Sequence, residues 1–183
     1  MIKIHGSSGI EFPNNYSIKS DSGDLTVMND VNKLWGMNST GYESKPNIVA
    51  FSAYGRHDDF GGHSNGTYAG SDRVMFNGTV RYNYGNSYNS TNSIFTAPIA
   101  GFYFITFNCH NNGSGVHRVS LLVNESFQPV GTGQVTTNNN FSQTSIIYLD
   151  AGDYVFVHNA YAGSIIYHAE GHNEFSGYLI GSR

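Results

Sequence analysis

The chain has 183 residues, a formal net charge of −4 and only 12% charged residues, whereas glycine (22 residues) and aromatic residues (14%) are abundant. This length fits one globular domain with a short additional segment, and the negative charge gives no attraction to a nucleic-acid backbone, so no nucleic-acid partner is expected. The single cysteine, Cys109, excludes an internal disulfide framework, and without a run of about 20 apolar residues no membrane insertion is expected.

Residues 1–45 contain short alternating runs, such as residues 2–4 and 24–28, separated by Gly, Ser and Asn turns. Strands this short bury little surface alone and become stable when several chains share a core. We therefore predict a β-rich fibre stem over residues 1–45, in which three chains intertwine. The alternatives are a flexible leader and a lone hairpin packed on the main domain. Every lysine lies at or before Lys45, which supports a boundary at Pro46.

Residues 46–183 show strand-like runs with turn signals about every ten residues, which is typical of an antiparallel sandwich or jelly roll. No helical periodicity of useful length interrupts them, so an all-β fold is expected. At residues 150–153 we predict a tight turn in which Gly152 has a positive φ. The expected strands span residues 48–53, 74–82, 102–109, 116–124, 145–149, 154–160 and 175–180.

Two of these runs, residues 102–107 and 154–157, are apolar on both faces. A strand with one face in water alternates apolar and polar residues, so the second face needs a cover. We predict that another subunit provides it, as in a homotrimer; the alternative is a large monomeric core with part-exposed aromatic residues at the strand ends. The residues expected in the core or the trimer contact are Phe51, Phe95, Tyr103, Phe104, Phe107, Tyr154, Phe156, Phe175 and Leu179.

The sequence contains no nucleophile elbow, phosphate-binding loop or zinc-protease motif, so no enzymatic activity is expected. Cys109 lies in an apolar run and is interpreted as a small buried side chain. The densest polar cluster is a Gly-rich loop that contains Arg56, His57, Asp58, Asp59 and His63. Its carboxylates suit Ca²⁺ and its imidazoles suit a transition metal, especially where threefold symmetry gathers three copies; the alternative is a solvated loop without a metal. No other cofactor is expected.

A second candidate binding loop, residues 83–89, carries Tyr84 and Tyr88 among Asn, Ser and Gly. Loops of this composition are common in adaptable binding surfaces. Aromatic rings flanked by amides suit the apolar faces and hydroxyl groups of sugars, so a surface glycan is the preferred ligand class. The alternative is a hydrated loop without a ligand.

Several fragments of residues 47–183 carry a family resemblance through their order and spacing. They are VAFSA (49–53), VMFN (74–77), IFTAP (94–98), GFYF (101–104), YLDAGDYV (148–155) and FSGYLI (175–180). Together they resemble the complement C1q-like domain, which is related in fold to tumour necrosis factor. The resemblance implies a ten-stranded jelly roll that forms a trimer at the head of a stalked assembly. Unlike in secreted animal relatives, neither a collagen-like repeat nor a signal peptide is expected before the domain.

The preceding segments IHGSSGIEFP (4–13) and WGMNSTGY (35–42) resemble the end of a bacteriophage tail-fibre shaft. In such fibres a C-terminal globular tip recognises the host. The combined resemblance implies a virion-surface attachment tip, with a host receptor and other fibre or baseplate proteins as partners. One rival hypothesis is a structural virion fibre or decoration trimer, and the other is a secreted ligand-binding protein outside the cell.

Overall fold

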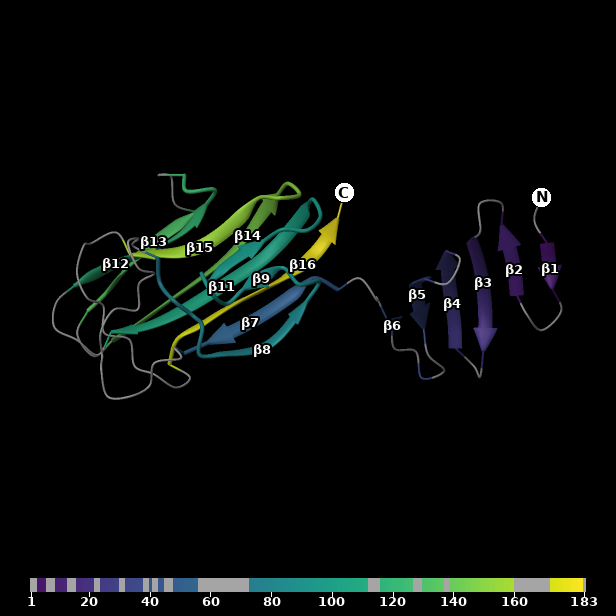
Figure 1. Ribbon diagram of the computed structural model, residues 1–183, viewed down its shortest axis with the longest axis horizontal. Coiled ribbons are helices and arrows are strands. Elements are labelled where there is room, and N and C mark those ends of the chain that lie inside the picture. The colour runs from purple at the N-terminus through teal and green to yellow at the C-terminus, as the bar shows by residue number, and fades with distance from the viewer. Residues whose placement is uncertain are drawn as a thin grey trace. The chain divides into compact units, whose positions relative to one another are not determined.

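The computed structural model shows strands, turns and loops throughout the residues that it describes (Figure 1). The chain divides into two compact units, Met1–Ile48 and Val49–Arg183. The predicted all-β class is confirmed for the described residues, and none of them belongs to a helix long and apolar enough to cross a membrane. The described residues are 3–5, 9–12, 16–21, 24–29, 32–37, 40, 43–44, 48–55, 73–111, 116–126, 130–136, 139–159 and 172–182.

The first unit, called the stem, is one antiparallel sheet in which each strand pairs with its neighbours in sequence. Its pairing register places one apolar residue from each of five strands in a single cross-strand row, Ile4, Ile10, Ile18, Val27 and Trp35. The strands are β1 (Lys3–His5), β2 (Gly9–Phe12), β3 (Tyr16–Asp21), β4 (Asp24–Asn29), β5 (Asn32–Met37) and β6 (Glu43–Ser44).

Apolar side chains remain exposed in the stem. Leu25 and Met37 are cross-strand partners on β4 and β5, and they are 43% and 40% exposed. The described stem residues form one sheet layer, whereas an apolar sheet face is normally buried by a second layer. These exposed residues agree with the expectation that stems associate, and the intertwining of three chains stays a prediction.

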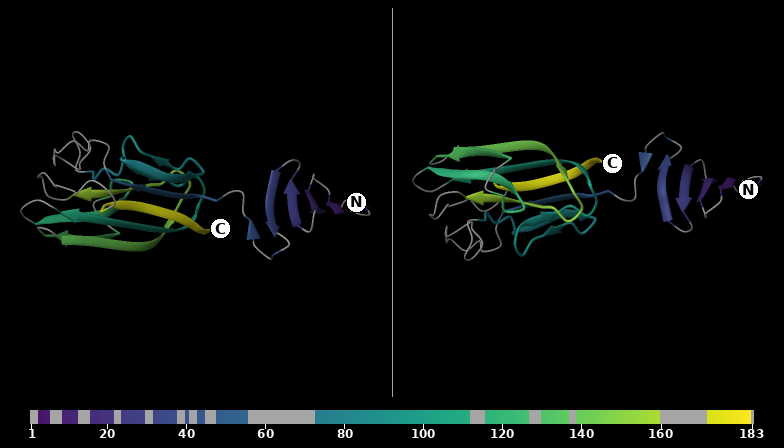
Figure 2. Two further views of the ribbon diagram at one scale, coloured as in Figure 1. Left: turned by 90° about the horizontal axis from the view of Figure 1, so that it is seen from below. Right: turned by 90° about the horizontal axis from the view of Figure 1, so that it is seen from above.

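The second unit, called the head, is a sandwich of two five-stranded antiparallel sheets (Figure 2). The β11 sheet has the order β14-β11-β16-β7-β8, and the β15 sheet has the order β13-β12-β15-β10-β9. The strands are β7 (Ala50–Tyr54), β8 (Thr79–Tyr84), β9 (Tyr88–Asn89), β10 (Ile94–Thr96), β11 (Gly101–Asn111), β12 (His117–Val123), β13 (Gly131–Val135), β14 (Asn139–Leu149), β15 (Tyr154–Asn159) and β16 (Glu174–Ser182).

The core of the head lies between the two sheets and is centred on Phe51. The Phe51 ring stacks on Tyr88 and on Phe95 at centroid distances of 4.9 Å, and it meets Phe175 edge-on. Gly177 makes room for this cluster, because a Cβ there would lie 3.0 Å from the Phe51 ring. Among the residues predicted for the core or trimer contact, Phe104, Tyr154 and Leu179 are only partly buried, whereas exposure is 4% or less for Phe51, Phe95, Tyr103, Phe107, Phe156 and Phe175.

The predicted strand over residues 74–82 is wrong in its position. Val74 instead donates its N–H to the Val157 carbonyl at 2.8 Å, and the strand begins at Thr79. The short strands β9, β10 and β13 were not among the expected runs, because two to five residues give too little alternation to detect. The predicted turn is confirmed, with Gly152 at a φ of 94°.

Candidate functional site

The outward face of the β11 sheet carries an apolar row that crosses all five strands. Strand register aligns Ile146, Phe104, Tyr178, Ala50 and Tyr84 across β14, β11, β16, β7 and β8. Phe104 stacks on Tyr178 with a centroid distance of 5.2 Å. Ile146, Tyr178 and Tyr84 are 65%, 48% and 60% exposed, so this row lies open on the head surface.

More exposed apolar side chains continue this face toward the end where the chain enters β7 and leaves β16. Phe102 packs edge-on against Tyr148, with the ring centroids 5.4 Å apart. Both rings are more than 40% exposed, as is Ile180. We call the following set the apolar half of the face: Phe102, Phe104, Ile146, Tyr148, Tyr178 and Ile180.

The opposite half of the same face is polar and closely hydrogen-bonded. Thr106 Oγ1 lies 3.0 Å from Thr144 Oγ1, and Ser142 donates to Asn108 Oδ1 at 2.8 Å. Glu174 accepts from Ser52 at 2.9 Å and forms an ion pair with Arg81 at 3.1 Å. A hollow of about 230 Å³ lies here, lined by Thr106, Phe107, Asn108, Ser142, Glu174 and Ser176.

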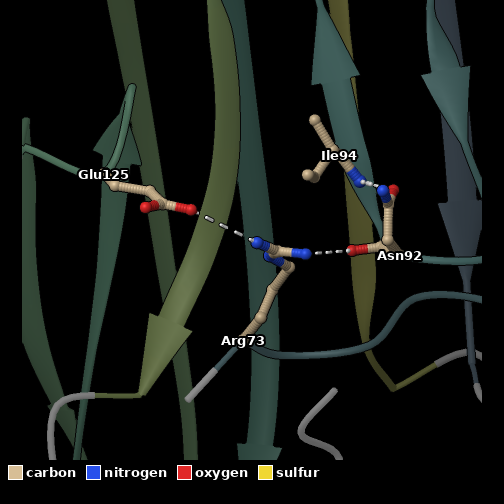
Figure 3. A network of polar contacts seen from close by, with 4 residues as sticks. All are labelled: Arg73, Asn92, Ile94 and Glu125. Atoms are coloured by element: carbon tan, nitrogen blue, oxygen red, sulfur yellow. Dashed lines mark hydrogen bonds and ion pairs between the residues drawn. The ribbon is translucent and has the colours of Figure 1, made fainter. Parts of the chain in front are cut away.

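The outward face of the β15 sheet is covered differently. Phe156 is only 4% exposed, because the Arg73 guanidinium lies 4.6 Å from its ring centroid. Arg73 also donates to the Asn92 carbonyl at 3.3 Å and lies 3.9 Å from the Glu125 carboxylate (Figure 3). We expected another subunit to cover the second face of both runs that are apolar on both faces, residues 102–107 and 154–157. This expectation is wrong at Phe156, because Arg73 of the same chain covers its ring.

The two tyrosines of the predicted glycan loop have opposite environments. Tyr84 is 60% exposed, whereas Tyr88 is 5% exposed and donates its hydroxyl to the Phe76 carbonyl at 2.7 Å. The Asn83 side chain bonds both the N–H and the carbonyl of Tyr88, which fixes this inward conformation, and burial raises the pKa of the Tyr88 hydroxyl. The Tyr88 ring therefore belongs to the core in this structure, and ligand binding by this loop stays a prediction.

Tyr82 belongs to the exposed aromatic surface and was missed. Its ring stacks on Tyr84 with a centroid distance of 5.8 Å, and it is 42% exposed. The two residues are two positions apart on β8, so they point to the same side of the strand. This period of two was the signal in the sequence that could have identified the pair.

The other predicted ligand and metal residues lie outside the described residues. These are Arg56, His57, Asp58, Asp59 and His63. Within the described parts of the chain, no three His, Cys, Asp or Glu side chains are grouped as a metal site. Cys109 is buried, as the sequence predicted. Metal binding by the loop after Gly55 stays a prediction.

Known proteins resemble the head in fold and in sequence. The globular domain of zebrafish complement 1qA protein superposes with a TM-score of 0.55 and 18% identity, covering 74% of this chain and 99% of that one. The Eiger TNF of S. frugiperda superposes with a TM-score of 0.51 and 13% identity, covering 75% and 95%. Both comparisons show the fold, which agrees with the jelly roll expected from the family resemblance.

A sequence relative is a complement C1q subcomponent of Bos taurus, 27% identical over 113 residues. The alignment covers 60% of this chain and 46% of that relative, so the chain spans less than half of the relative's length. The profile of the C1q domain matches residues 60–180, which is well over half of the chain. The chain therefore belongs to the C1q domain family.

Proposed function

We propose that the head is a non-enzymatic recognition module that works as a homotrimer, in which the copies bury the apolar half of the β11 sheet. The observation that carries this proposal is the row of exposed aromatic and aliphatic side chains from Ile146 to Tyr178. A solvated face of an antiparallel sheet is normally polar, and an open apolar face of this kind marks an interaction site. Family membership supports the proposal, since C1q-like domains typically form trimers and bind ligands or receptors.

The occupant of this face is a second copy of the chain. No residue of the apolar half is charged, and four of its six residues are aromatic, which is the composition of a buried contact between protomers. Light scattering coupled to size exclusion should show three chains per particle. A monodisperse 20.0 kDa monomer at micromolar concentration would contradict the proposal.

At a finer level, we propose that the trimer is the attachment tip of a viral or phage fibre and binds a host-surface glycan. The support for a glycan is the stacked pair Tyr82 and Tyr84 on β8, the last strand of its sheet among the described residues. A flat pair of stacked, exposed rings suits the apolar face of a sugar ring. Each contact is weak, and three protomers on several fibres provide avidity. Likeness of the stem to a fibre shaft supports the viral context.

Replacement of both Tyr82 and Tyr84 by alanine tests the glycan platform. The double variant should stay trimeric and lose most of its binding to host cells and to a glycan array. Thr79→Ala, at another exposed position of β8, is the matched control and should bind normally. Normal binding by the double variant excludes this platform, and dissociation of its trimer assigns the two rings to the contact between protomers instead.

A secreted ligand-binding protein is the second candidate function. The similarity to the complement C1q subcomponent of Bos taurus favours it over a viral role. Electron micrographs of virions labelled with an antibody against this chain separate the two. Labelled fibres support attachment or a structural fibre role, and whole-cell binding then distinguishes these two. Unlabelled virions, together with an upstream reading frame that encodes a secretion signal, support the secreted protein.

A further inference from the structure

Two histidine rings lie near each other at the polar end of the β11 sheet, beyond Asn108 on β11. His110 lies on β11, and His172 lies in the segment that leads into β16. Their ring centroids are 5.4 Å apart, with an angle of 44° between the ring planes. The His172 residue is exposed and His110 is partly exposed, so the pair is open to solvent in one copy of the chain.

The backbone on both sides of this pair is fixed by short hydrogen bonds. His110 donates its N–H to Asn173 Oδ1 at 2.6 Å, and Asn108 donates to the His172 carbonyl at 2.6 Å. Asn173 is 3% exposed, and its carbonyl accepts from the N–H of Gly55 at 3.1 Å. The two rings are therefore presented from a rigid base, which lowers the entropic cost of holding a shared ligand.

We propose that His110 and His172 together bind one divalent transition-metal ion, such as Zn²⁺. An ion held at about 2.0–2.1 Å from one nitrogen of each ring, in tetrahedral geometry, places the two ring centroids about 5 Å apart. The observed 5.4 Å fits this arrangement without a change of fold.

Hydrogen bonding assigns the ligand atom on His110. Its Nδ1 lies 2.6 Å from Asn140 Oδ1, and an amide oxygen only accepts, so Nδ1 carries the proton. The lone pair then lies on Nε2, which becomes the metal ligand. A metal-bound imidazole usually donates its other N–H to such an oxygen, so Asn140 acts as a positioning residue.

The surroundings favour a borderline metal over a hard cation. Glu174 lies nearest in sequence among the described carboxylates, and its carboxylate already accepts from Ser52 and pairs with Arg81. Ca²⁺ and Mg²⁺ need several oxygen ligands, whereas imidazole suits Zn²⁺, Ni²⁺ and Cu²⁺. Within the part of the chain that the structure describes, no third His, Cys, Asp or Glu joins the pair.

Titration of the full chain with ZnCl₂ in an isothermal calorimeter tests the site, with CaCl₂ as the hard-cation comparison. We expect the His pair to bind one Zn²⁺ per chain, and any heat released with Ca²⁺ to be the same in the wild type and in the His110→Gln variant. His110→Gln and His172→Gln should each weaken Zn²⁺ affinity at least about tenfold, and Asn140→Leu should weaken it about 10–100-fold, the usual effect of losing such a supporting contact. His158→Gln, on β15 of the other sheet, is the matched control and should bind normally.

A second readout keeps the test independent of the variants' folding. Adding Ni²⁺ to the wild-type chain should broaden the NMR signals of the His110 and His172 rings and leave that of His158 on β15 sharp. Three results would overturn the proposal: no saturable Zn²⁺ binding by the wild type, unchanged affinity in both His variants, or a ratio of one ion per three chains.

Discussion

The two sheets of the head both carry aromatic residues on their outward faces, yet only one of these faces is closed by its own chain. Arg73 covers Phe156 on the β15 sheet, whereas Phe102 on the β11 sheet is 46% exposed. Both runs were apolar on both sides in the sequence. A strand that is apolar on both faces thus predicts that both faces are buried. Whether its own chain or another subunit buries the second face depends on residues that lie far away in the sequence.

The largest expected effect concerns the open face. Ile146→Lys places a charge within the proposed contact between protomers, where burying it without a partner costs several kcal/mol. The particle mass should fall from three chains to one at micromolar concentration, while the circular dichroism of the monomer stays β-rich. Gln134→Lys, at an exposed position of β13 in the other sheet, should leave the mass unchanged. A trimer that tolerates Ile146→Lys would move the contact elsewhere.

An intermediate effect is expected on the closed face. Arg73→Met removes the guanidinium from Phe156, from the Asn92 carbonyl and from Glu125. Loss of a buried cation–π contact and a hydrogen bond should lower the free energy of unfolding by about 2 kcal/mol. Urea denaturation measures this change, and the trimer mass should not change. A double-mutant cycle with Phe156→Leu should show coupling, and strictly additive effects would argue against the cover.

The smallest effect is expected at the boundary between the apolar and polar halves of the open face. Thr106 donates to the Gln143 carbonyl at 3.0 Å and lies beside the Thr144 hydroxyl. Thr106→Val keeps the shape and removes these bonds, so the free energy of unfolding should fall by about 1 kcal/mol. Urea denaturation at constant protein concentration checks this value. A gain in stability would instead show that this row is buried among apolar groups of another copy.

The fold was predictable where strand-like runs stand between turn signals. Strands β11, β15 and β16 followed from runs rich in aromatic and β-branched residues that are bounded by Gly, Asn and Asp. The start of β8 was predicted too early, because Val74 and Met75 are apolar like the residues of a core strand. In the structure this segment pairs with β15 at one isolated bridge, between Arg73 and His158.

The candidate site was less predictable than the fold. Tyr84 and Tyr88 lie in the same Asn-rich and Gly-rich segment, so composition alone gave them the same role. The Asn83 amide, which bonds the Tyr88 backbone, decides that one ring enters the core and the other stays outside. Likewise, Arg73 reaches Phe156 from a position more than 80 residues away in sequence, and no local pattern reports such a contact.

Pairing in the stem has a consequence for how this protein can evolve. Among the described stem residues, each strand pairs with its neighbours in sequence, so each hairpin is a local unit. A hairpin can be duplicated or deleted without changing any pairing in the head, in the way that repeat proteins gain and lose units. The number of hairpins in the stem is therefore free to vary under selection, while the sandwich, whose strands pair across long stretches of sequence, has to be inherited whole.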